Sequence, residues 1–136
     1  MSYIPNKQKI ASKELSEKLR KLVLDKYNEM QNITEIGGVS VATALVDDDI
    51  EKLVLIALRE AEQPLSWRDL KVIFSGIVGE DRLRRILASL KAKNEVAELT
   101  HTRFALPEYV PLNEISRVKN PGIISKILEK KKEEVQ

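Results

Sequence analysis

The sequence predicts a mainly helical domain with a small β-hairpin, an α+β fold, within its 136 residues. Apolar residues recur at helical spacing in three successive segments between residues 49 and 94, and two short strand-like runs follow them. Aromatic residues make up only 4% of the chain, which is typical of helices packed around an aliphatic core. A charged fraction of 32% beside 43% hydrophobic residues indicates a globular domain and not a disordered chain.

The first predicted element is an amphipathic helix from Ser12 to about Asn32. Its apolar residues recur on one helical face. This face could pack back on the chain's own core or against a second copy, and we expect a homodimer or a larger protein assembly. The residues predicted to make the dimer contact are Leu15, Leu19, Leu22, Val23 and Met30.

Residues 33–48 allow two interpretations. After a Gly-Gly pair, Val39, Val41, Thr43 and Leu45 stand at every second position, as they would on one face of a short strand. A helix of small residues fits nearly as well, through Val39, Ala42, Thr43 and Val46, and the sequence does not decide between the two. Three consecutive aspartates at 47–49 close the segment, and their charge favours a helix N-terminus over a metal site.

Three helices are predicted in the middle of the chain, over residues 49–61, 66–75 and 80–94. The second of them starts with Ser66, and Asp69 follows three residues later. This is the spacing of a capping box. Gly76 is a natural C-terminal stop for that helix. Only a short turn separates the second helix from the third.

Two short runs, 96–99 and 103–106, flank Thr100-His101-Thr102 and predict a tight hairpin. This order of elements, three helices with a short turn before the last and then a hairpin, resembles the winged helix-turn-helix superfamily. The resemblance covers about residues 48–108. The resemblance implies that helix 80–94 enters the major groove of double-stranded DNA. It also implies that the wing, residues 99–104, contacts the DNA backbone.

The predicted organisation has three parts. Residues 1–46 form an N-terminal helix and connecting segment for packing or dimerisation, and residues 47–108 form the winged-helix domain. Residues 109–136 form an extended connection and a charged helix. In small prokaryotic regulators that the chain resembles, flanking helices of this kind often supply dimerisation, which places two recognition helices about 34 Å apart on DNA.

Basic side chains are concentrated on the third predicted helix. Between Glu80 and Lys93 there are five basic and two acidic residues, a net charge of +3, whereas the whole chain carries +2. Guanidinium groups match both phosphates and guanine edges. Trp67, the only tryptophan, could pack over the first helix or present its indole N–H to a phosphate. The residues predicted to contact DNA are Arg82, Arg84, Arg85, Ser89, Lys91, Lys93, Thr100, Thr102, Arg103, Arg68 and Lys71.

The charge balance also supports a second interpretation, a protein–protein interaction module. Residues 49–107 carry ten basic and nine acidic side chains, a net charge of +1, which is low for a dedicated DNA binder. Glu80 and Asp81 at the start of the third helix would repel phosphates. The leading hypothesis is therefore a DNA-binding transcription regulator, and the alternative is a non-catalytic subunit of a transcription, replication or membrane-remodelling assembly.

Composition argues against several other functions. The chain has no cysteine, which excludes disulfides, thiolate catalysis and iron–sulfur clusters, and His101 is its only histidine. Carboxylates form no isolated pair on an apolar face, so we expect no enzyme, cofactor or metal, and no small-molecule effector is identifiable. No window approaches the roughly 18 apolar residues of a membrane span. We expect a cytoplasmic protein, associated with the nucleoid if it binds DNA.

Overall fold

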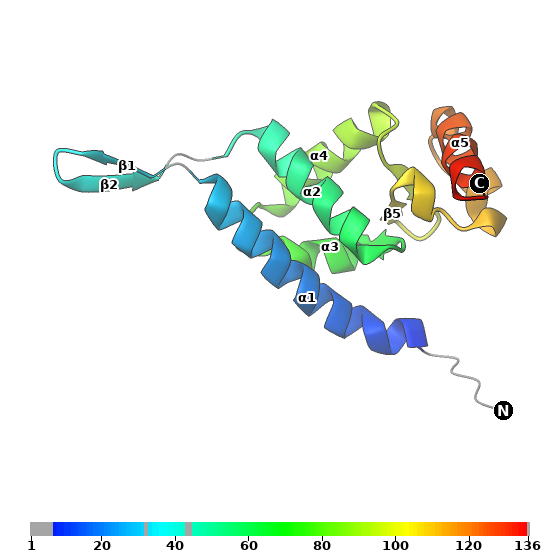
Figure 1. Cartoon of the computed structure of the whole chain (residues 1–136), viewed down its shortest axis with the longest axis horizontal. Helices are drawn as coiled ribbons and strands as arrows, with labels where there is room; N and C mark the ends of the chain where they lie inside the picture. The colour runs from blue at the N-terminus through cyan, green and yellow to red at the C-terminus, as the bar shows by residue number, and fades with distance from the viewer. Residues whose placement is uncertain (1–6, 32, 43–44, 136) are drawn as a thin grey trace.

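The computed structural model describes residues 7–31, 33–42 and 45–135 (Figure 1). Helices predominate beside two small antiparallel sheets, so the predicted α+β class is confirmed. The α-helices are α1 (Lys7–Met30), α2 (Asp47–Ala61), α3 (Trp67–Ile73), α4 (Glu80–Ala92) and α5 (Ile124–Val135). The strands are β1 (Ile33–Ile36), β2 (Val39–Ala42), β3 (Leu65–Ser66), β4 (Ala97–Leu99) and β5 (Arg103–Ala105). Between β5 and α5 lie the 3-10 helices η1 (Pro107–Tyr109), η2 (Leu112–Arg117) and η3 (Pro121–Ile123).

Helices α2, α3 and α4 form where the sequence predicts them, because local signals specify each one. The aspartates at 47–49 all lie in the first turn of α2, where their charge complements the helix dipole. The predicted capping box at the start of α3 is present. The backbone amide of Asp69 donates to Ser66 Oγ at 3.1 Å, and the amide of Ser66 donates to Asp69 Oδ2 at 3.2 Å. Gly76, with a φ of +81°, turns the chain after α3.

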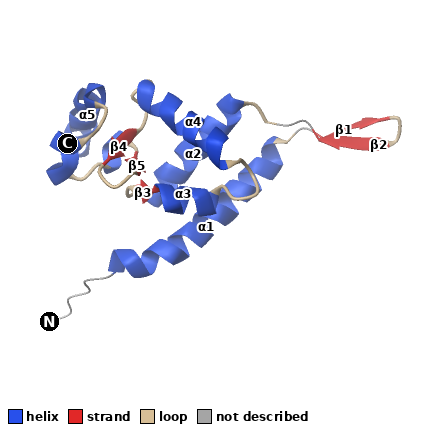
Figure 2. Cartoon of the chain, turned by 180° about the vertical axis from the view of Figure 1, so that it is seen from behind, coloured by secondary structure: helices blue, strands red, loops and turns tan. Residues whose placement is uncertain are grey.

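Helix α1 packs along α2 and α3, on the chain's own core (Figures 1 and 2). Leu19 and Val23 are fully buried there, Leu15 and Met30 are partly buried against the same core, and Leu22 is half-buried. The prediction that Leu19 and Val23 make a dimer contact is therefore wrong, because these side chains have no exposed surface to offer a second copy. The sequence left open whether this helical face packs on the chain's own core or against a second copy. In the structure it packs on the chain's own core.

The predicted hairpin is confirmed as β4 and β5, and β3 adds a third strand that the sequence did not indicate. The strand order is β3-β5-β4, and both pairings are antiparallel. Leu65 pairs with Phe104, so the two-residue strand β3 joins the start of α3 to the hairpin. At the hairpin tip, His101 and Thr102 have φ values of +62° and +51°.

Residues 33–42 form a separate β1–β2 hairpin, so the strand interpretation of this segment holds. Gly37 and Gly38 have φ values of +60° and +81°, as a two-residue type I′ turn requires. The hairpin projects away from the helices (Figure 1). Ile36 and Val39 face each other beside the turn and are 64% and 62% exposed. Thr43, which the strand pattern would include, lies outside the described residues.

The C-terminal segment is folded against the β3–β5–β4 sheet, at the opposite end of the molecule from the β1–β2 hairpin (Figures 1 and 2). The prediction of an extended connection after residue 108 is wrong, because η1, η2 and η3 turn the chain back on the sheet. The final helix is confirmed as α5. A second, smaller core results, made of Ala97, Leu99, Ala105, Val110, Val118, Ile123 and Ile127.

Candidate nucleic-acid interface

The solvent-facing side of α4 is the centre of the predicted interface. Leu83, Ile86, Leu87 and Leu90 are buried and recur at i, i+3, i+4 and i+7, which fixes the rotation of the helix on the core. The opposite side is exposed and consists of Asp81, Arg84, Arg85, Ala88 and Ala92. On this side, the small side chains of Ala88 and Ala92 therefore lie between the two arginines and the C-terminal end of α4.

Three of the predicted DNA contacts are held by α2 and the segment before it, namely Arg82 and Ser89 of α4 and Lys93 directly after it. Arg82 Nε lies 2.7 Å from Asp47 Oδ1, and Arg82 Nη2 donates to the carbonyl of Leu45 at 2.9 Å. Lys93 Nζ donates to Glu51 Oε1 at 2.5 Å, and Ser89 Oγ donates to Glu51 Oε2 at 3.3 Å. The hydrogen bond to Glu51 raises the pKa of Lys93 above its ordinary value of 10.5. These side chains fasten α4 to α2.

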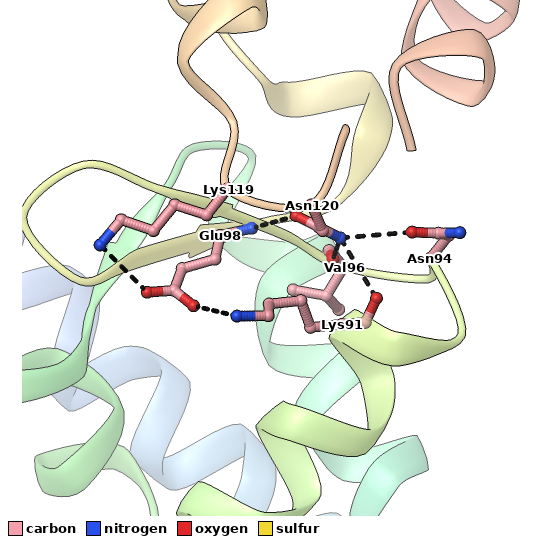
Figure 3. A network of polar contacts seen from close by, with 6 residues as sticks. All are labelled: Lys91, Asn94, Val96, Glu98, Lys119 and Asn120. Atoms are coloured by element: carbon pink, nitrogen blue, oxygen red, sulfur yellow. Dashed lines mark hydrogen bonds and ion pairs between the residues drawn. The ribbon is translucent and has the colours of Figure 1, made fainter. Parts of the chain in front are cut away.

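Lys91 belongs to a polar network around Asn120 (Figure 3). Its ammonium lies 2.9 Å from Glu98 Oε1, while Lys119 Nζ lies 3.7 Å from Glu98 Oε2. The Asn120 amide donates to the carbonyls of Val96 at 2.9 Å and Lys91 at 3.2 Å, and its oxygen accepts from the amide of Glu98 at 3.1 Å. Asn120 thus joins the end of α4, strand β4 and the C-terminal segment.

Arg103, predicted to contact phosphate from the hairpin, is bound within the chain. Its guanidinium forms a two-point ion pair with Glu114 of η2, and its Nε donates to the carbonyl of Thr100 at 3.0 Å. Its Nη2 also donates to the hydroxyl of Thr100 at 3.2 Å. Thr102 remains exposed at the tip. Arg103 and Thr100 therefore hold the shape of the hairpin.

Trp67 lies where α3, α4 and the hairpin tip meet. The guanidinium carbon of Arg84 is 4.9 Å from the centroid of the Trp67 ring, and Lys71 Nζ is 6.0 Å from it. The backbone amide of Trp67 donates to the carbonyl of Thr102 at 2.9 Å. Its ring is half-buried and packs against the main core. Arg68, the next residue, is exposed.

A groove of about 400 Å³ opens between α4 and the β4–β5 hairpin. Trp67, Leu87, Ala88 and Phe104 form its apolar lining. Its polar lining is formed by Arg84, Lys91, Glu98 and Thr102. The sequence did not reveal this groove, because its walls come from separate elements and the apolar pattern assigns Leu87 and Phe104 to the core.

Ion pairing narrows the set of basic side chains available to a ligand. Six of the predicted contacts pair with carboxylates of this chain, including Lys71 with Glu80 at 3.6 Å and Arg85 with Asp47 at 3.9 Å. Among the described residues, Arg68 and Arg84 have no carboxylate within ion-pair distance. Arg85 is 67% exposed, and its ion pair is the longest of the six. Of the predicted DNA contacts in the described part of the chain, the basic side chains that remain available are therefore Arg68, Arg84 and Arg85.

Other kinds of site are not found in the described part of the chain. No group of three or more His, Asp or Glu side chains there could hold a metal ion. None of the helices that the structure describes combines the length and apolar character needed to cross a bilayer. No model of a known protein family, no curated protein and no solved structure matches this chain.

Proposed function

We propose that this chain is a winged-helix protein that binds double-stranded DNA and regulates transcription. In this proposal α4 is the recognition helix, and the β4–β5 hairpin is the wing. The order α2, α3, α4, β4, β5, with the two-residue strand β3 between α2 and α3, supports it, because a winged helix has three helices followed by a hairpin. The single observation that carries the proposal is the outer face of α4, where two exposed arginines precede two exposed alanines.

The shape of this face suits the major groove. A B-DNA major groove is about 12 Å wide and admits one α-helix, so large side chains on the outer face would hold the helix away from the bases. Ala88 and Ala92 allow a close approach. Arg84 and Arg85 can then reach guanine edges or phosphates in the groove. In this proposal Arg68, which is exposed at the start of α3, contacts a backbone phosphate.

The internal ion pairs reduce the positive field without preventing this contact. Exposed ion pairs contribute only about 0–1 kcal/mol each, so exchanging a surface carboxylate for a phosphate costs little. The low cost of this exchange applies above all to Arg85, because its ion pair with Asp47 is long and exposed. We therefore assign the main DNA contacts to Arg68, Arg84 and Arg85, with Thr102 of the wing tip.

Duplex binding by a double variant tests the proposal. Arg84→Ala with Arg85→Ala should weaken binding of a labelled duplex and lower the slope of log K against log salt by about 0.9 for each phosphate that is no longer neutralised. Lys52→Ala with Arg59→Ala removes the same charge from exposed positions of α2 and serves as the control. Equal loss of affinity in both double variants would indicate only a general charge effect and would contradict the proposal.

A protein–protein interaction module is the second candidate. The observation that favours it is the matching of α4 and hairpin cations by carboxylates from other elements, namely Asp47, Glu51 and Glu114. Such matching leaves a nearly neutral face. If the wild-type chain fails to bind duplex DNA even at low salt, this candidate replaces the first. The exposed Ile36 and Val39 of the β1–β2 hairpin are then the first residues to substitute in a search for the protein contact.

A further inference from the structure

The groove between α4 and the β4–β5 hairpin has a chemistry that a regular duplex does not satisfy. A duplex presents phosphates, sugars and base edges, whereas the floor of this groove is made of Leu87, Ala88 and Phe104, beside the ring of Trp67. Its volume of about 400 Å³ lies within the range of about 300–1,000 Å³ typical of sites for small organic ligands. A duplex seated on α4 alone would leave this apolar space unfilled.

An unpaired nucleobase has the shape and polarity that the groove requires. Outside the stack, a base exposes flat apolar faces, and proteins bind these faces on aromatic rings or arginine planes. Trp67 and Arg84 already supply one of each, with the guanidinium 4.9 Å from the ring centroid. The two groups therefore form a stacking platform at the side of the groove.

The rim of the groove is positive, which suits the phosphates on either side of such a base. Glu98 is the only carboxylate among the described residues that line the groove. Its two oxygens face Lys91 at 2.9 Å and Lys119 at 3.7 Å, so its charge is more than balanced (Figure 3). Arg84 adds a further cation without a carboxylate partner in the described part of the chain.

The wall formed by the hairpin tip is held in a strained conformation. Thr102 is β-branched and has a φ of +51°, a region that such residues rarely adopt and that is often found at functional sites. The backbone amide of Trp67 donates to the carbonyl of Thr102 at 2.9 Å. This hydrogen bond keeps the hairpin tip against the start of α3. The wall and the stacking platform are thus fixed to each other before any ligand binds.

We propose that this groove binds one unpaired nucleobase, so that the protein prefers DNA in which an unpaired nucleotide adjoins a duplex. This inference rests on the proposed DNA binding, and it names the kind of DNA. The base stacks on the guanidinium of Arg84, which lies over the Trp67 ring, and the outer face of α4 contacts the adjoining duplex.

The test compares two labelled DNAs of the same sequence, one fully paired and one with a single-thymine bulge, by fluorescence anisotropy. Stacking of one base on this platform predicts binding of the bulged DNA about five-fold to about 150-fold tighter. Because Trp67 is the only tryptophan, its own emission provides a second readout. The bulged DNA should quench this emission at saturation, and the paired DNA should not.

Two variants assign the preference to the groove. Trp67→Leu should bring the two affinities together, whereas Trp67→Phe, which keeps a stacking ring, should retain most of the difference. Equal binding of both DNAs by the wild type, with equal quenching, would overturn this inference and leave the proposed duplex binding intact. Failure to bind either DNA would instead overturn the proposed function. A preference that survives Trp67→Leu in a folded variant would show that the base binds elsewhere.

Discussion

Replacement of Asn120 by alanine should destabilise the fold more than the same change of any other asparagine that the structure describes. The side chain of Asn120 forms three hydrogen bonds with backbone groups, namely the amide of Glu98 and the carbonyls of Val96 and Lys91. These groups belong to β4, the segment before it and the end of α4. Alanine removes every one of these bonds, and Asn120 has a φ of −117° that alanine can adopt, so the backbone itself need not change.

The size of the effect follows from the number of bonds. A hydrogen bond contributes about 0.5–1.5 kcal/mol to stability, and a buried polar group left without a partner costs about 1–3 kcal/mol. The Asn120 bonds are only part-buried, so water can replace some of them. We therefore expect Asn120→Ala to lower the free energy of unfolding by about 2–3 kcal/mol, at about 1 kcal/mol for each bond.

Equilibrium unfolding in urea measures this loss. Asn113→Ala is the matched control, because Asn113 is an exposed asparagine of η2. It should change the free energy of unfolding by no more than about 0.5 kcal/mol. A loss below that size in Asn120→Ala would refute the reasoning, since it would mean that the C-terminal segment does not depend on this side chain to hold the sheet.

Three further predictions concern stability. Ser66→Ala removes the capping box of α3 and should cost about 0.5–2 kcal/mol in urea unfolding, with the exposed Ser125→Ala as control. Leu19→Ala leaves a cavity and should cost about 2–5 kcal/mol at every protein concentration, whereas dependence on concentration would show that the substitution breaks a dimer interface. The raised pKa of Lys93 means that its stabilising interaction with Glu51 is present below pH 10.5 and disappears as the pH rises through the folded-state value. Lys93→Met and the wild type should therefore differ in urea unfolding at about pH 9 and converge above the folded-state value.

The parts of the fold that local signals specify could be predicted from the sequence. The spacing of Ser66 and Asp69 is sufficient for a capping box, and the apolar stripe of α4 defines its buried side without knowledge of its neighbours. The C-terminal segment has no such signal. Its buried residues Val110, Val118 and Ile123 follow neither a helical nor a strand period, because irregular 3-10 turns bring them to the sheet.

The candidate interface was predictable only in outline. The outer face of α4 follows from the helical period, so the sequence places Arg84 and Arg85 correctly on it. The partners of the other cations could not be foreseen, because Glu114 reaches Arg103 only after the chain has folded back. For the same reason, the sequence alone could not show whether Leu19 of α1 packs on the chain's own core or against a second copy.

The salt dependence of binding to a random duplex tests the central claim most directly. Phosphate contacts by Arg68, Arg84 and Arg85 alone predict a slope of about −2.7 in log K against log salt, at about 0.9 for each contact. Affinity measured by anisotropy should therefore fall about forty-fold between about 50 and 200 mM salt. Binding that is absent at about 50 mM, or present with no dependence on salt, would contradict the account of α4 as a DNA-binding helix.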